Sequence, residues 1–218
     1  MDTHLNDPTL SSSGQAIDLA AHPLTWAQVI QTMPDKVREL EVGSGKGLFL
    51  QTAALADPNR HFVGIELSHK FANRAAQRIY KLGLSNVTLL CGDAKKFLSE
   101  VVPDQAVQCV HVYFPDPWWR NKHKKRRVLN EQTLQDIQRV LPLGGQFHFW
   151  TDALDYYEHI CQEVMQHTQL TGPRYVPERG VHHAMDYTTH FERRARLSSQ
   201  PVYRAIFEKQ QVLTDHQK

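Results

Sequence analysis

Short apolar runs alternate with longer amphipathic segments over most of the chain. The apolar runs are bounded by Gly, Pro, Asp or Asn, which is typical of buried strands. We therefore predict strands at five places: Val37–Val42, His61–Leu67, Asn86–Cys91, Ala106–Phe114 and Gln146–Thr151.

Helical periodicity fills the intervals between these runs. Ser68 is a candidate N-cap, and Gly83 is a candidate stop for the helix that follows it. The predicted helices are Leu48–Ala56, His69–Leu82, a short segment that begins near Lys95, Glu131–Leu141 and Leu154–Leu170. Strands that alternate with helices pair in parallel and carry helices on both faces. The predicted fold class is therefore α/β, a Rossmann-like, doubly wound, mostly parallel sheet.

The two ends of the chain depart from this alternation. Residues 1–20 are rich in Ser, Asp, Asn and Pro, so we expect them to be disordered. Phe191–Arg196 is predicted to be helical, and Val202–Glu208 is predicted to be a late antiparallel strand. With no internal repeat, residues 21–218 are expected to form a single domain.

Composition narrows the class of protein. Hydrophobic residues make up 41% of the chain, and no apolar run is long enough to span a membrane. The first 35 residues hold no Lys or Arg, which argues against a secretory signal. Three widely spaced cysteines without a C-x-x-C motif argue for a reducing compartment, with the cytoplasm as the default. His182 and His183 lack a matching third ligand, so no metal is expected.

Charge is concentrated in one place. The chain has a net charge of +2, but six of eight residues between Arg120 and Arg127 are Lys or Arg. Without these six, 19 basic residues face 23 acidic ones, a net charge of −4. A local basic patch on a mildly acidic body indicates a docking site for a polyanion. A solvated loop or a nuclear address sequence is the simpler alternative.

A glycine-rich segment, E-V-G-S-G-K-G, follows the first predicted strand. Gly43 and Gly45 allow a tight turn and a close approach of the backbone to a ligand. The segment is not a phosphate-binding P-loop, because no Ser or Thr follows Lys46. It is not a dinucleotide fingerprint either, because Leu48 stands where a third glycine is needed. A glycine turn without a ligand is the alternative.

Acidic residues end the next two predicted strands. Glu66 lies 23 residues after Gly43, where a carboxylate can accept hydrogen bonds from both hydroxyls of a ribose. Asp93 lies where an adenine edge would sit in such a fold. The alternatives are an exposed carboxylate for Glu66 and an N-cap for Asp93.

These motifs resemble those of the Rossmann-like, S-adenosylmethionine-dependent methyltransferases of class I. The resemblance assigns Glu41, Gly43, Gly45, Glu66 and Asp93 to cofactor binding. In that class an acidic residue just before the glycine loop approaches the amino acid part of S-adenosylmethionine. The order of the motifs indicates the class but not the substrate.

The segment F-P-D-P-W-W follows the fourth predicted strand, next to the basic run. Pro115 and Pro117 each fix their own φ angle, and Pro117 also restricts Asp116. A carboxylate with so little freedom suits preorganised catalysis. Trp118 and Trp119 offer surfaces on which a base could stack, with core packing as the alternative.

This segment and its basic tail closely resemble the family of tRNA guanine-N7 methyltransferases. The cofactor loop, G-I-E-L, G-D-A, W-T-D and T-H-F-E-R-R also match, over roughly residues 22–209. The resemblance implies S-adenosylmethionine as cofactor and tRNA as substrate, with guanine 46 of the variable loop as the target. We expect a monomer or homodimer without an obligatory partner subunit.

The same resemblance assigns roles to individual residues. Asp116 is expected to be catalytic and to lie at the cofactor. The expected substrate contacts are Arg120 (where the family more often has Lys), Asp152, Thr189, His190, Phe191 and Glu192. The expected contacts to the RNA backbone are Lys122, His123, Lys124, Lys125, Arg126 and Arg127. A helix cap for Asp152 and pairing of Glu192 with a neighbouring Arg are the alternatives.

Other functions remain open at this point. Amino-group methyltransferases of nucleic acids carry a D/N-P-P-aromatic motif after the same strand, and D-P-W is a loose echo of it. A non-catalytic RNA-binding protein could keep the fold, although the acidic cofactor residues argue against it. A nicotinamide enzyme would leave the basic run unexplained.

Overall fold

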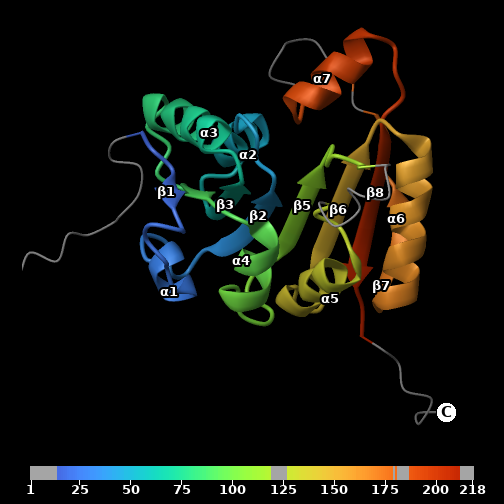
Figure 1. The fold of residues 1–218 in the computed structure, drawn as a ribbon, viewed down its shortest axis with the longest axis horizontal. Helices are drawn as coiled ribbons and strands as arrows, with labels where there is room; N and C mark the ends of the chain where they lie inside the picture. Colours follow the sequence, from blue (N-terminus) through green and yellow to red (C-terminus); the bar gives the residue numbers. More distant parts are fainter. Residues whose placement is uncertain (1–13, 119–126, 179, 181–186, 212–218) are drawn as a thin grey trace, which may run out of the picture.

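The computed structural model describes residues 14–118, 127–178, 180 and 187–211. Its strands form one sheet in the order β1-β4-β3-β2-β5-β6-β8-β7 (Figure 1). The strands are β1 (Ile17–Asp18), β2 (Val37–Val42), β3 (Arg60–Glu66), β4 (Val87–Cys91), β5 (Cys109–Tyr113), β6 (Gln146–Thr151), β7 (Leu170–Tyr175) and β8 (Tyr203–Lys209).

Helices cover both faces of this sheet. They are α1 (Trp26–Val29), α2 (Leu48–Ala56), α3 (His69–Lys81), α4 (Ala94–Glu100), α5 (Glu131–Val140), α6 (Leu154–His167) and α7 (His190–Leu197). The apolar sides of α2 and α3 pack on one face, whereas α1, α4, α5 and α6 bury a larger core on the other. In Figure 1, α7 stands apart from both layers, beyond the tips of β5 and β6.

The sheet is wound in two directions from its centre. Strands β2, β3 and β4 are parallel neighbours on one side, and β5 and β6 continue the parallel arrangement on the other. Val42 of β2 lies between Ile65 of β3 and Val112 of β5. The loops that follow these three strands therefore emerge side by side, at the point where such sheets bind ligands. The predicted fold class is confirmed, and β8 is the late antiparallel strand.

Three elements, α1, β1 and β7, were not predicted. The expectation of disorder up to residue 20 is wrong at Ile17–Asp18, which form β1 beside β4, and the Leu19 N–H donates to the Cys91 carbonyl at 2.9 Å. The helix predicted to reach Leu170 ends at His167, because Leu170 starts the edge strand β7. Every residue of β7 after Leu170 is exposed, so no apolar alternation announces this strand.

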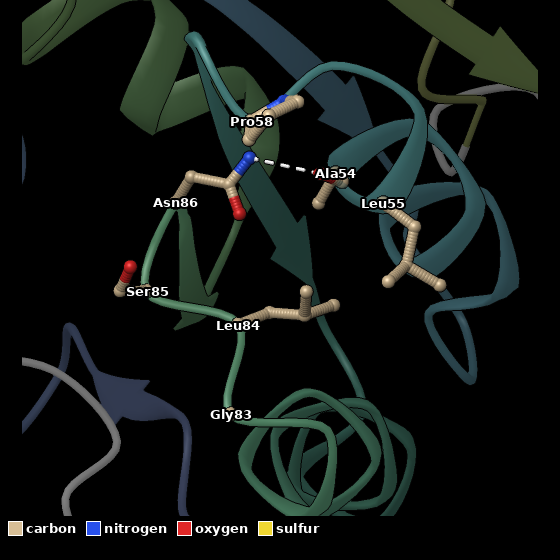
Figure 2. Close-up of a pocket in the computed structure, with 7 residues that line it drawn as sticks. All are labelled: Ala54, Leu55, Pro58, Gly83, Leu84, Ser85 and Asn86. Carbon is tan, nitrogen blue, oxygen red and sulfur yellow. Dashed lines mark hydrogen bonds between the residues drawn. The ribbon is translucent and has the colours of Figure 1, made fainter.

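At the amino ends of β3 and β4, opposite to the carboxyl ends, lies a shallow hollow of about 240 Å³ (Figure 2). It is lined by Ala54, Leu55, Pro58, Gly83, Leu84, Ser85 and Asn86. The Asn86 amide nitrogen lies 3.1–3.2 Å from three carbonyl oxygens, those of Ala54, Asp57 and Arg60. This amide holds the end of α2 to the start of β4, so the hollow is a structural joint remote from the strand carboxyl ends. Among the described residues, no helix is long and apolar enough to cross a membrane.

Candidate active site at the carboxyl ends of the strands

The glycine loop after β2 adopts a conformation that side chains disfavour. Gly43, Gly45 and Gly47 have φ angles of +78°, +53° and +71°. A Cβ atom built on Gly43 or Gly45 would meet no atom within 4 Å, whereas one built on Gly47 would lie 2.8 Å from the Ala75 Cβ. The first two glycines therefore leave open space for a ligand, and the third allows α2 to pack against α3.

Two carboxylates lie beside this loop. Glu66 accepts hydrogen bonds from the Gly45 N–H at 3.0 Å and from the Ser68 N–H at 2.8 Å. Glu41 is only 3% exposed, and its Oε2 has no hydrogen-bond partner among the residues that the structure describes. Burial, and next the charge of Glu66, raise the pKa of Glu41 well above its usual value. A buried carboxylate left in this way is costly unless a cationic group joins it.

Asp93 ends the next strand and caps the helix that follows. Its Oδ1 accepts a hydrogen bond from the Lys95 N–H at 2.9 Å at the start of α4. The capping role that the sequence left as an alternative is therefore present. Because β4 pairs with β3, Asp93 also lies in the same row of strand ends as Glu66.

The F-P-D-P-W loop follows β5, next to the glycine loop. Asp116 is exposed, while Phe114 and Trp118 on either side have φ angles of +51° and +42°. Bulky residues avoid this left-handed region, at a cost of roughly 1–2 kcal/mol each. Such a backbone persists only where the surroundings hold it. One restraint is the Phe114 N–H, which donates to the Trp150 carbonyl of β6 at 2.7 Å.

Side chains from distant parts of the chain supply further restraints. Phe191 of α7 stacks on Phe114, with ring centroids 6.1 Å apart and planes 19° apart. The Arg127 Nε donates to the Pro117 carbonyl at 2.8 Å, and Arg127 is 9% exposed. The sequence predicts Arg127 as a surface contact to phosphate, yet the structure places it under the loop. The other residues of the predicted basic site, Arg120, Lys122, His123, Lys124, Lys125 and Arg126, lie outside the described residues.

Helix α7 carries the predicted T-H-F-E segment and is anchored to the sheet. Thr189 caps the helix by accepting from the Glu192 N–H at 3.0 Å. The Glu192 carboxylate accepts from Arg204 Nη2 of β8 at 2.8 Å, and both side chains are 5% exposed. The Arg204 guanidinium also stacks on Trp150, 4.9 Å from the ring centroid. Arg196 Nη1, four residues further along α7, lies 3.6 Å from Glu192 Oε1, so the neighbouring arginine that the sequence left open is present. The shorter contact comes from the last strand.

The remaining predicted substrate residues lie on the rim. His190 Nε2 is 3.3 Å from Arg78 Nη2 of α3. Burial, and next the cations Arg78 and Lys46, lower the pKa of His190, so its ring is neutral. Asp152 is exposed directly after β6, and the N-cap position of α6 falls on Ala153. The helix-cap alternative for Asp152 is therefore wrong.

A buried chain of polar side chains behind the site was not predicted from the sequence. His111 contacts the Tyr113 hydroxyl through Nδ1 and the Glu39 carboxylate through Nε2, each at 2.8 Å. Arg60 donates to the other Glu39 oxygen at 2.6 Å. The period-2 order C-V-H-V-Y in β5 is the signal that places these side chains on one face.

Glu39, Cys109 and His111 bring ligand atoms within 4.8 Å of one another, a spacing at which a metal could be held. Burial, and next the charge of Glu39, raise the pKa of the Cys109 thiol to about 12. A protonated thiol is a poor ligand, and both Glu39 oxygens already have cationic or imidazole partners. The group is better described as a hydrogen-bonded link between β2 and β5.

Comparison with known proteins agrees with this geometry. A family model described as "Putative methyltransferase" matches residues 35–205. The tRNA (guanine-N(7)-)-methyltransferase of Rhodopirellula baltica is 41% identical over 181 residues, which cover 80% of this chain and 67% of the relative. The same enzyme of Alcanivorax borkumensis is 37% identical over 179 residues, 80% of this chain and 73% of the relative.

Solved structures support the fold. The 16S rRNA methyltransferase KamB superposes with a TM-score of 0.63 at 17% identity, covering 85% of this chain and 94% of that one. At such low identity the likeness shows the architecture alone.

Proposed function

This chain belongs to the family of tRNA (guanine-N7-)-methyltransferases, and we propose that it methylates N7 of a guanine in tRNA with S-adenosylmethionine as the methyl donor. The finer proposal is that the target is guanine 46 of the variable loop. The observation that carries the proposal is the rigid, exposed carboxylate of Asp116 beside the open glycine loop, on adjacent parallel strands.

The residues that follow β2, β3 and β4 form the cofactor half of the site, and they fit S-adenosylmethionine. The unpartnered, buried Oε2 of Glu41 suits the ammonium group of the amino acid part. Each Glu66 oxygen accepts one backbone N–H, which leaves lone pairs for the ribose hydroxyls. Gly43 and Gly45 leave room for a close approach, and Asp93 would meet the adenine edge. When bound, this cofactor supplies an electrophilic methyl group on a sulfonium.

The loop that follows β5, Asp152 and helix α7 form the substrate half of the site. This half suits a nucleophile that needs no general base. Guanine N7 has a lone pair and no proton, and methylation leaves the purine positively charged. The Asp116 carboxylate can accept hydrogen bonds from the N–H groups of guanine and stabilise the charge that develops on the ring. Phe191 and Asp152 are exposed where they can contact the base or its neighbours.

We propose further substrate contacts at Arg120 and His190. The resemblance also implies substrate roles for Thr189 and Glu192. Contacts to phosphates are assigned to the basic residues between Lys122 and Arg126. Thr189 and Glu192 are buried, so their contribution is to hold α7 in place. We expect the chain to act without a partner subunit.

The test is to incubate the purified chain with labelled S-adenosylmethionine and an unmodified tRNA transcript, then digest and identify the nucleoside. N7-methylguanosine is expected, and borohydride and aniline cleavage should map it to position 46. A transcript with adenine at position 46 should take up no label. A different methylated base would overturn the N7 assignment, and label at another guanine would overturn the position alone.

A further inference from the structure

The last arginine of the basic run is directed into the protein and not toward the solvent. We propose that Arg127 is a positioning residue that holds the Asp116 loop in its reactive conformation, and that it is not a phosphate contact. This inference rests on the proposed function, since it concerns the geometry of the catalytic carboxylate.

Three contacts fix the Arg127 guanidinium. Its Nε donates to the Pro117 carbonyl at 2.8 Å, and its Nη1 lies 2.9 Å from His159 Nε2 of α6. Its central carbon lies 5.7 Å from the ring centroid of Tyr156, a fully buried residue of the same helix. The planar fork of Arg makes the two hydrogen bonds from two separate nitrogens, Nε and Nη1, whereas a lysine would have to reach both acceptors from one nitrogen.

The carbonyl that accepts from Arg127 belongs to the strained part of the Asp116 loop. Pro117 directly follows Asp116, and its carbonyl begins the peptide that leads into the left-handed Trp118. Phe114, on the other side of Asp116, is already fixed by its hydrogen bond to Trp150 and by Phe191. Arg127 therefore restrains the second end of a loop whose first end is held independently.

Electrostatics places the two charges near the same side chain. Burial raises the pKa of Tyr156 to about 12, the Arg127 cation opposes this rise, and the Asp116 anion adds to it. Arg127 and Asp116 thus both act on Tyr156.

His159 is the second hydrogen-bond partner of Arg127. An arginine side chain can only donate, so His159 Nε2 accepts in this contact. On its other side, His159 Nδ1 lies 4.0 Å from Glu163 Oε1 of the same helix. This arrangement turns α6 into a fixed support for Arg127.

The first experiment compares Arg127→Met, Arg127→Lys and Lys124→Met in steady-state methylation of tRNA. Arg127→Met should lower kcat by roughly 30- to 100-fold with KM for tRNA within about twofold, because only the loop geometry is lost. Arg127→Lys should recover part of this loss, since its ammonium can still reach the Pro117 carbonyl. Lys124→Met should instead raise KM and reduce the salt slope by about one. A raised KM with unchanged kcat for Arg127→Met would make Arg127 a phosphate contact and overturn the proposal.

The second experiment does not depend on catalysis. Hydrogen exchange of the peptide that covers residues 113–118 should become faster in Arg127→Met, while exchange in β2 and β3 stays the same. Unchanged exchange in this peptide would overturn the proposal even if activity falls. If the wild-type protein makes no N7-methylguanosine, the proposed function fails while the exchange result still decides whether Arg127 holds the loop.

A partner variant covers the case in which Arg127→Met does not fold. His159→Leu should lower kcat several-fold, because Arg127 loses its hydrogen bond to α6, and His159→Gln should restore kcat through an amide oxygen that can accept. Equal kcat in the wild type, His159→Leu and His159→Gln would contradict the proposal.

Discussion

The cofactor half and the substrate half of the site are held together in different ways. In the cofactor half, the glycine loop is held through its own backbone N–H groups. The Gly43 N–H donates to the Ile65 carbonyl at 2.8 Å, and the Gly45 N–H donates to the Glu66 carboxylate. The positive φ angles of this half fall on glycines, where they cost little.

After β5, the strained residues are Phe114 and Trp118. Their loop is restrained by side chains that come from α7 and from the segment after residue 126. The conformation of the glycine loop therefore depends on its backbone and on glycine, whereas the conformation of the Asp116 loop depends on a few contacts with distant side chains.

The largest expected effect separates the two halves directly. Asp116→Asn keeps the shape of the side chain and removes its charge, so kcat should fall by about 10²- to 10³-fold. The Kd for the cofactor should change by no more than severalfold, because Glu41, Glu66 and the glycine loop remain intact. Single-turnover methylation and calorimetric titration of the cofactor measure the two quantities.

Asp155→Asn is the matched control for this change. Asp155 is an exposed carboxylate in the first turn of α6 and is expected to behave like the wild type. Full methyl transfer by Asp116→Asn at saturating substrates would remove Asp116 from the chemistry.

A change at Glu41 should weaken cofactor binding and leave kcat nearly unchanged, the opposite of the change at Asp116. Glu41→Gln should weaken cofactor binding by about 10- to 100-fold, because the cationic group loses its anionic partner. At saturating cofactor, kcat should be nearly normal. Equal cofactor affinity in both proteins would show that the ammonium group binds elsewhere.

The pH dependence sharpens this test. Because the pKa of Glu41 is raised in the folded protein, the carboxyl must lose a proton to pair with a cation. Cofactor affinity of the wild type should therefore rise with pH until Glu41 is ionised, and Glu41→Gln should not share this rise.

In the free protein, the stability of the wild type should fall as pH rises from the ordinary Glu value through the raised pKa, because the unfolded chain ionises more easily. The melting temperature of Glu41→Gln should then exceed that of the wild type increasingly as pH rises.

The packing of the cofactor loop gives a smaller effect on stability. Gly47→Ala places a Cβ atom 2.8 Å from the Ala75 Cβ and in the left-handed region, which should cost about 2–3 kcal/mol. Gly83→Ala is the matched control, because Gly83 also has a positive φ but its Cβ would meet nothing within 4 Å. It should cost only about 1 kcal/mol. Equal losses in urea unfolding would mean that close packing of α2 on α3 does not matter.

The same contrast explains what the sequence could predict. Glycine spacing, strand ends and Glu66 are local features, so the cofactor loop and its neighbours were predicted to within a residue or two. A neighbouring arginine was expected for Glu192, and Arg196 is one, but the closer partner Arg204 was missed because it reaches Glu192 only through the pairing of β8 with β6. The inward position of Arg127 was also missed, since a segment with six Lys and Arg in eight residues gives no sign of which one is directed inward. Strand β7 was missed because its exposed residues leave no apolar pattern.

The smallest expected effect tests whether the loop depends on α7. Phe191 is 47% exposed, so Phe191→Ala should lower the melting temperature very little. Its stacking on Phe114 is worth about 0.5–1.5 kcal/mol, and losing it should lower kcat by roughly 3- to 10-fold if that energy holds the strained Phe114 in place. Leu197→Ala, at a residue of the same helix that is 67% exposed, should leave kcat unchanged. A normal kcat in Phe191→Ala would mean that the hydrogen bond from Phe114 to Trp150 is sufficient at that end. Of the two side-chain restraints on the Asp116 loop argued above, Arg127 would then be the one that matters for kcat.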